Sequence, residues 1–281
     1  MQLPRRVFLA LALGAPVSAS RAADRSILLA TTTSAENSGL LGYLLPRFEK
    51  ASGIRVKVVA VGTGQALKLG ERGDADLLLL HHPPSEEAFV AAGFGIDRRE
   101  IMANDFLLVG PAEDPAGARG RDVLAAFRAI AASGAPFVSR GDASGTHERE
   151  RELWRAAGID PGSAARGWYR EAGSGMGATL NIAAAMGAYT LADRGTWASF
   201  ANRRGLVVLV EGDPRLSNVY AVTLVNPARH PHVKVAEARA LADWLGGPEG
   251  QAAIGSFEVG GTRPFRPIAT ARAVPGSDGG R

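Results

Sequence analysis

The sequence predicts an α/β protein of two lobes, and three observations carry this prediction. Short aliphatic and β-branched runs alternate with segments of helical periodicity along most of the chain. The alternation restarts after Pro111, where a second lobe would begin, and the long apolar run 219–227 can return the chain to the first lobe. With 281 residues, the chain is long enough to bury two cores.

In the first half of the chain, apolar spacing and capping residues delimit the elements. Apolar residues recur at helical spacing between positions 40 and 48, and Gly53 can end that helix. Ser85 can cap a later helix, and Gly93 can end it. The expected strands are 26–30, 55–62, 74–82 and 104–111, and the expected helices are 38–53, 64–73 and 85–93.

The second half repeats the alternation. The expected strands are 136–140, 167–172, 205–213 and 219–227. The expected helical segments are 121–133, 146–158, 175–188, a turn and helix in 189–203, and two closing helices in 233–257. Residues 24–109 and 222–270 are therefore predicted to form lobe 1 and residues 110–221 lobe 2, with a flexible tail at 271–281. Each lobe should hold a mixed, mostly parallel sheet flanked by helices.

The N-terminus reads as an export signal. Arg5 and Arg6 precede an apolar run and then small residues, which is the pattern of a signal peptide over residues 1–22. The two arginines also suit the twin-arginine route. We therefore expect a periplasmic protein.

Composition excludes several classes of function. The chain has no cysteine, so it has no disulfide and no thiolate metal site. Removing residues 1–22 takes away three arginines and no acid, which lowers the formal charge from +4 to +1. Because no basic stripe with interleaved aromatics is present, nucleic acid is not an expected partner.

Four polar, glycine-rich segments follow predicted strands and precede predicted helices: 31–39, 62–66, 139–147 and 172–180. In parallel α/β sheets these positions are the strand ends where ligands bind, and helix N-termini there offer free N–H donors to anions. Arg140 adds a planar, permanently charged fork suited to an oxyanion. Taken singly, each segment can also be a simple helix cap, and Arg140 can be a surface ion-pair partner of Asp142 or Glu148.

Signals for other chemistry are weaker. Ser144 and His147 lie close in sequence, so an exported Ser/His hydrolase is an alternative, although no third member of a triad is indicated. The pairs His81–His82 and His230–His232 lack a spaced carboxylate partner, which favours loop features over a metal site. Nucleotide-binding fingerprints are lacking. We therefore expect no catalytic residue, no metal ligand and no cofactor.

Several motifs, in order along most of the mature chain, resemble the tungstate-binding proteins of bacterial ABC uptake systems. These motifs include TTTSAENSGLL, VGTGQAL, FVSRGDASGTHERE and GSGMGATLNIAA. The resemblance implies a two-lobed periplasmic binding protein of type II, with two crossovers between lobes. It also implies that the protein binds tungstate, with molybdate as a possible second ligand, and delivers it to an ABC permease and ATPase as a monomer.

The resemblance also carries over a set of ligand-binding residues from all four polar segments. They are Thr32, Thr33, Ser34, Thr63, Gly64, Arg140, Ser144, Gly145, Thr146, Ser174, Gly175 and Met176. Two departures from the family pattern flank these positions, at Ala35–Glu36 and at Ala172 with Ser174. They bear on selectivity more than on function.

The segment SRGDASGT also resembles phosphate-binding proteins, which is the alternative within the binding class. Phosphate often keeps a proton near neutral pH and favours an acceptor carboxylate in its site, whereas tungstate carries no proton and would be repelled by one. Asp142 could be that acceptor, or it could turn away to orient Arg140. The sequence leaves its direction open.

Overall fold

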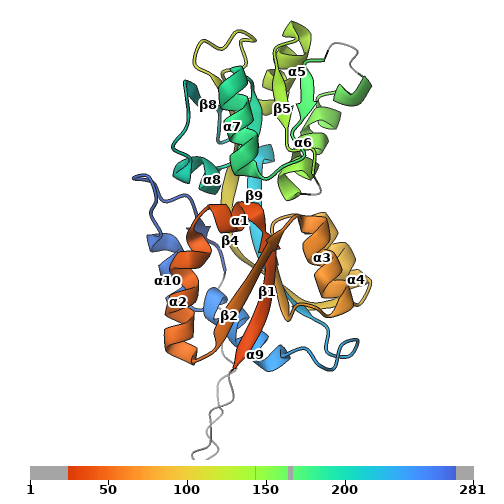
Figure 1. Ribbon diagram of the computed structural model, residues 1–281, viewed down its shortest axis with the longest axis vertical. Coiled ribbons are helices and arrows are strands. Elements are labelled where there is room, and N and C mark those ends of the chain that lie inside the picture. The colour runs from red at the N-terminus through yellow and green to blue at the C-terminus, as the bar shows by residue number, and fades with distance from the viewer. Residues whose placement is uncertain (1–24, 143, 164–166, 270–281) are drawn as a thin grey trace, which may run out of the picture.

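The computed structural model describes residues 25–142, 144–163 and 167–269. The predicted signal peptide and the predicted tail lie outside these residues. Two halves lie one above the other, and the strands β4 (Gly95–Pro111) and β9 (Ser217–Val225) run between them (Figure 1). These two long strands are antiparallel neighbours, and Asn104 pairs in register with Asn218. The two connections that the family resemblance implies therefore lie side by side.

The first half is built on a sheet with strand order β10-β4-β9-β3-β1-β2. Its further strands are β1 (Ser26–Thr32), β2 (Arg55–Val61), β3 (Leu77–Leu80) and β10 (Arg266–Pro267). Its helices are α1 (Thr33–Asn37), α2 (Leu40–Ser52), α3 (Thr63–Arg72), α4 (Pro83–Ala91), α9 (Val235–Gly246) and α10 (Pro248–Ser256). β1 pairs in parallel with β2 and β3, whereas β9 runs antiparallel to β3. The parallel strands therefore end together at the edge that faces the second half.

The second half uses the end of β4, which pairs antiparallel with β7 (Thr190–Asp193) and β8 (Leu206–Val210). A separate parallel pair is formed by β5 (Phe137–Ser139) and β6 (Tyr169–Glu171). The helices of this half are α5 (Val123–Ser133), α6 (Gly145–Ala156), α7 (Met176–Met186) and α8 (Arg194–Ser199), with short 3-10 turns η1 (Pro161–Ser163) and η2 (Pro214–Leu216).

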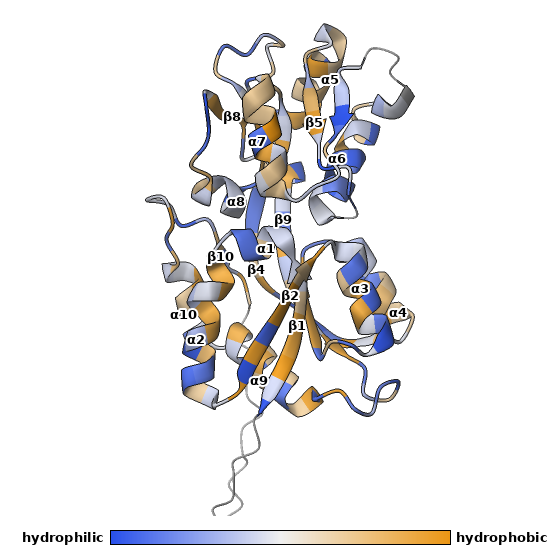
Figure 2. Ribbon diagram, in the orientation of Figure 1, coloured by the Kyte–Doolittle hydropathy of each residue, from blue (hydrophilic) through white to orange (hydrophobic). Residues whose placement is uncertain are grey.

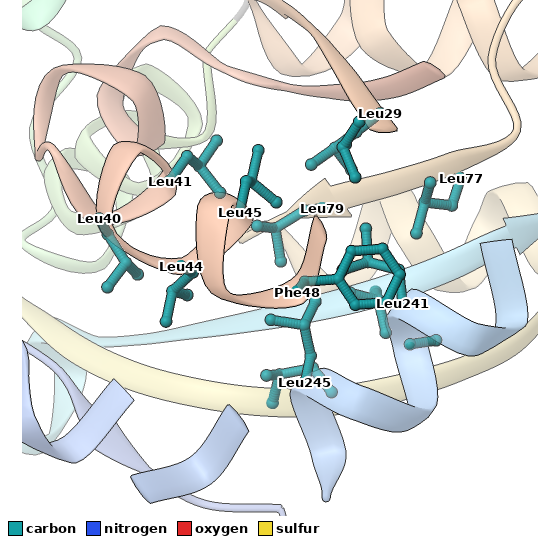
Figure 3. Packing of buried hydrophobic residues seen from close by; sticks show 14 of the residues in the cluster. Leu29, Leu40, Leu41, Leu44, Leu45, Phe48, Leu77, Leu79, Leu241 and Leu245 are labelled. Atoms are coloured by element: carbon teal, nitrogen blue, oxygen red, sulfur yellow. The ribbon is translucent and has the colours of Figure 1, made fainter. Parts of the chain in front are cut away.

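The apolar spacing between positions 40 and 48 does form a helix, and its apolar face is the core of the first half. Figure 3 shows this face of α2 packed toward β1, β3 and α9. The residues are Leu40, Leu41, Leu44, Leu45 and Phe48, all at most 8% exposed. Each such burial stabilises the fold by about 1.5–3 kcal/mol. Gly53 ends α2 with φ of 69°, a left-handed conformation that glycine adopts without strain.

The second half has its own apolar clusters, one of them rich in aromatic side chains. Phe127, Phe137 and Trp154 pack ring against ring, with centroids 4.2–5.8 Å apart. Figure 2 shows apolar residues gathered along the strands of both halves, with hydrophilic stretches on the helices α2, α3 and α6. Each half therefore holds a core of its own, on which the site elements rest.

Four features depart from the element predictions. The segment 33–37 forms the short helix α1 where a polar loop was expected. β4 begins at Gly95, well before the predicted 104, because its charged residues are held by ion pairs such as Arg98 with Glu86. The predicted turn at 189 is the strand β7, and β10 had no counterpart among the predictions.

Candidate anion-binding site

The four polar segments predicted from the sequence lie at the N-terminal ends of four helices. α1 and α3 belong to the first half, and α6 and α7 belong to the second. The first N–H groups of a helix have no partner within it, and the helix dipole makes that end positive. Contacts join all four ends across the junction between the halves. The sequence therefore brings its predicted segments to one place, as expected.

Arg140 is the central contact of this junction. Its side chain is only 1% exposed, so the surface interpretation of this residue is wrong. Its Nε donates to the carbonyl of Ser174, at 3.1 Å. Its terminal nitrogens donate to the hydroxyls of Ser34, at 3.3 Å, and Thr33, at 3.5 Å, on α1 of the opposite half. A buried guanidinium thus spans the two halves.

The carboxylate of Asp142 points at Arg140 and Ser144. One oxygen accepts from the guanidinium of Arg140, and the other accepts from the hydroxyl of Ser144, at 2.5 Å. Ser144 also caps α6 by accepting from the backbone N–H of His147, at 3.2 Å. The carboxylate of Asp142, whose direction the sequence left open, therefore turns to orient Arg140, and each of its oxygens accepts a hydrogen bond.

Several hydroxyls keep a proton that could be donated to a ligand. Among the described residues, Thr146 Oγ1 and Ser174 Oγ are buried without a hydrogen-bond partner. The hydroxyls of Thr33 and Ser34 accept from Arg140, which leaves their own protons unassigned. A buried hydroxyl without a partner costs about 1–3 kcal/mol. An anion with several acceptor oxygens would satisfy such donors.

The helix ends also meet through glycine and threonine. The backbone N–H of Gly145 donates to Thr63 Oγ1, at 2.9 Å, across the junction. A Cβ at Gly145 would lie 3.2 Å from the ring of His81 and 3.4 Å from Thr63, so a larger residue would push the two halves apart. Gly64, Gly175 and Met176 lie within the first turn or at the cap of their helices.

Burial shifts the pKa of two histidines and one carboxyl in or behind the junction toward the uncharged form. Burial lowers the pKa of His81 to about 4 and lowers the pKa of His147. Burial raises the pKa of Asp193, which caps α8 and whose partner Thr196 reaches the carbonyl of Ser34. The pairing of His81 was missed from the sequence, where this residue was weighed only as a metal ligand or a loop feature.

The Ser144–His147 pair does not have the geometry of a nucleophile and its base. Ser144 gives its hydroxyl proton to Asp142, and the His147 ring bonds through Nδ1 to Ser139, at 3.1 Å. The contact between Ser144 and His147 uses the backbone N–H of the histidine. These contacts serve to cap and orient the start of α6.

The other predicted groups have structural contacts of their own. His230 and His232 bond through Nε2 to the carbonyls of Glu71 and Gly73, both at 2.9 Å. Across the described residues, no cluster of three or more His, Asp or Glu side chains is arranged to hold a metal ion. A cavity of about 650 Å³ lies beside α6 and β6, and none of the twelve predicted site residues lines it. The site is therefore defined by its contacts rather than by that cavity.

Comparison with known proteins identifies the family. The model of the PBP superfamily domain matches residues 17–249. The tungstate-binding protein TupA of Peptoclostridium acidaminophilum is 48% identical over 238 residues, which cover 84% of this chain and 82% of that protein. The chain belongs to the tungstate-binding protein family. TupA of Campylobacter jejuni is 39% identical over 75% of this chain and 80% of its own length.

Solved structures of family members share the fold. The tungstate-binding protein of Desulfovibrio alaskensis matches with a TM-score of 0.76 and 47% identity, covering 88% of this chain and 100% of that one. The tungstate ABC transporter structure from Geobacter sulfurreducens matches with a TM-score of 0.76 and 48% identity, over 83% of this chain and 98% of that one. The family resemblance and the two-lobed fold class are thus confirmed.

Similarity to phosphate-binding proteins is limited to the fold. A phosphate ABC transporter binding protein from Clostridium perfringens, solved with phosphate, has a TM-score of 0.64 at only 12% identity. Family membership therefore places this chain with the binding components of ABC transporters. In the part of the chain that the structure describes, every helix is too short or too polar to cross a membrane.

Proposed function

We propose that this protein captures tungstate between its two halves and delivers it to an ABC permease and its ATPase. One observation carries the proposal. Buried Arg140, together with the N-terminal ends of four helices, joins the two halves through groups that donate hydrogen bonds. Such an arrangement fits a small tetrahedral dianion, which accepts from all sides and needs no acid or base from the protein.

The contacts of Asp142 favour tungstate over phosphate. A protonated phosphate needs a carboxylate oxygen with a lone pair turned toward the anion. The two oxygens of Asp142 are instead turned to Arg140 and Ser144, and each accepts a hydrogen bond there. A fully deprotonated anion makes no demand on this carboxylate, and the pairing with Arg140 screens its charge.

Size supplies the selectivity against sulfate. Backbone donors at helix ends are fixed by their helices, so they cannot follow a smaller anion inward. We expect the spacing to match the longer metal–oxygen bonds of tungstate, which molybdate shares. Both anions are therefore proposed ligands, and the four helix ends that carry the twelve predicted site residues are proposed to surround them.

Transport follows from closure of the halves around the anion. Arg140 contacts α1 and Gly145 contacts Thr63, so the two halves touch through site residues themselves. A bound anion would stabilise this closed form, which a permease can distinguish from the empty protein. We propose that the exported protein acts in the periplasm as a monomer, without cofactor or catalysis.

Calorimetric titration tests the proposal directly. The purified mature protein, stripped of ligand, would be titrated with tungstate, molybdate, sulfate and phosphate at the same pH and salt concentration. We expect tight one-to-one binding of tungstate and no heat with sulfate or phosphate. Binding of phosphate with no response to tungstate would overturn the proposal and would return Asp142 to the role of a proton acceptor.

A further inference from the structure

His81 follows β3 at the end that faces the second half, and it is 3% exposed. We propose that His81 is a positioning residue, which fixes the first turn of α1 for anion binding and ties it to the strands that join the halves. The inference rests on the proposed function, because the value of a fixed α1 lies in the donors that it presents.

Hydrogen bonds on both ring nitrogens carry this inference. His81 Nε2 lies 3.1 Å from the hydroxyl of Thr32, the residue that caps α1. His81 Nδ1 lies 2.9 Å from Oδ1 of Asn218 on β9. Asn218 in turn donates through Nδ2 to Oδ1 of Asn104 on β4, at 2.7 Å. A single buried chain of side chains thus runs from both connecting strands to the start of α1.

The direction of each proton in this chain follows from the partners. Oδ1 of Asn218 can only accept, so Nδ1 of His81 must carry the hydrogen. Burial lowers the pKa of His81 to about 4, so the ring is neutral near pH 7 and Nε2 is an acceptor. The hydroxyl of Thr32 therefore donates to His81, and its oxygen accepts from the backbone N–H of Ala35, at 3.3 Å.

This assignment gives Thr32 a different task from its neighbours. Its one proton is committed to His81, so its side chain holds the helix start rather than donating to an anion. Thr33 and Ser34, one and two residues further on, are the groups that meet Arg140. Fixing Thr32 therefore fixes the donors that face the second half.

The ring also lies where the second half meets the first. It stacks on Tyr220 of β9, with centroids 4.7 Å apart. The Cα of Gly145, at the start of α6, approaches so closely that an added Cβ would come within 3.2 Å of the ring. His81 is thus in contact with an anion-site element of each half and with a connecting strand.

Two substitutions that remove the same hydrogen bond test the inference. His81→Phe keeps a ring that can stack on Tyr220 but removes both ring nitrogens, and Thr32→Val removes the donor. Each variant should bind tungstate about tenfold more weakly than wild type, by calorimetry. Because both variants break the bond between His81 and Thr32, the loss in the double variant should be clearly smaller than the product of the two single losses. Independent, multiplying losses, or wild-type affinity in His81→Phe, would overturn the inference.

Two controls separate this outcome from a folding defect and from failure of the proposed function. His81→Gln, whose amide oxygen can accept from Thr32, should recover part of the lost affinity, and thermal unfolding without ligand checks the fold of each variant. If wild type responds to a different oxyanion, the proposed function fails and the cycle is measured with that anion.

A measurement that needs no ligand decides the proton assignment. Nitrogen NMR of the imidazoles in the ligand-free protein should show a neutral His81 with its proton on Nδ1, and Thr32→Val should shift the Nε2 signal. A proton on Nε2 would overturn the inference whichever anion is bound.

Discussion

The two sides of the proposed anion site are built from different kinds of groups. The first half contributes neutral groups: the hydroxyls of Thr33, Ser34 and Thr63 at helix ends, which accept from the second half, with neutral His81 behind them. The second half contributes the charged pair, Arg140 with Asp142. Since that pair carries no net charge, the helix ends of both halves must supply much of the attraction for a dianion. Neither side alone is a complete site, so binding should require both halves.

The largest expected effect comes from removing the charge of the second half. Arg140→Ala should weaken tungstate binding by about thirtyfold or more, because truncating one member of a buried, hydrogen-bonded charge pair costs about 2–5 kcal/mol and each 1.4 kcal/mol is about tenfold in affinity. It also leaves Asp142 unopposed beside a dianion. Calorimetry measures the loss, and Arg155→Ala, on the exposed side of α6, serves as the control. Tight binding by Arg140→Ala would show that neutral donors suffice.

The contrast extends to buried titratable groups behind the two sides. Glu150 on α6 accepts from Tyr169, at 2.8 Å, and Trp154, at 3.2 Å, and burial raises its pKa to about 7. His81 behind the first half has its pKa lowered to about 4. Folding therefore favours the neutral form of both groups, with opposite dependence on pH.

The two pKa shifts make the stability of the fold change with pH in opposite directions. For His81, the unfolded chain binds more protons between pH 6.5 and about 4, so stability falls as the pH falls through that range. For Glu150, the folded protein binds more protons between pH 4.5 and about 7, so stability falls as the pH rises through that range.

Glu150→Gln should remove the loss of stability that Glu150 causes as the pH rises. A shift of this size corresponds to at most about 3 kcal/mol, since one pKa unit is about 1.4 kcal/mol. The variant should be more stable than wild type at pH 8 and similar to it at pH 4.5, in urea unfolding of ligand-free protein. Equal stability of the two proteins at pH 8 would show that Glu150 ionises without penalty.

A smaller effect is expected from the hydroxyl of Thr146, which has no partner among the described residues. Thr146→Val keeps the shape and removes the donor. Binding of tungstate should weaken about tenfold, or about 1.4 kcal/mol, because a hydrogen bond to a charged group is lost. Stability without ligand should stay equal or rise, because no buried hydroxyl is left unpaired.

Thr190 provides a matched control for this prediction. Its hydroxyl is also buried without a partner in the described structure, but it lies on β7 and belongs to none of the four predicted polar segments. Thr190→Val should raise stability in the same way and leave tungstate affinity unchanged. A change in affinity for both variants, or for neither, would remove Thr146 from the proposed ligand set.

The sequence predicted the elements whose residue pattern alone shows how they fold, and it missed those that depend on distant partners. The helix α2 could be read from its apolar spacing because one face must be buried in any fold. The helix α1 could not, since four of its five residues are polar and it has no apolar period; it is held by Thr32 at its start and by Ser38, whose hydroxyl donates to the carbonyl of Ala35. The start of β4 was missed because its charges hide the alternation, and their partners lie on other elements.

The site shows the same division. The segment around Arg140 was recognisable as an anion motif, because glycine, hydroxyls and arginine before a helix are a local arrangement. The direction of the Asp142 carboxylate was not, since it depends on where Arg140 lies. The role of His81 could not be predicted, because its partners Thr32 and Asn218 are 49 and 137 residues away in the chain.

The smallest expected effect tests whether Ser144 orients the second half or reacts. Ser144→Ala removes the cap of α6, which should lower stability by about 1 kcal/mol. It also frees one oxygen of Asp142, whose other oxygen still holds Arg140. Tungstate binding should therefore weaken by only a few-fold, far less than in Arg140→Ala. Urea unfolding and calorimetry measure the two effects.

An ester or phosphoester hydrolysed by wild type, and not by this variant, would instead make Ser144 a nucleophile. The charged side of the site would then have evolved for chemistry rather than for closure around an anion.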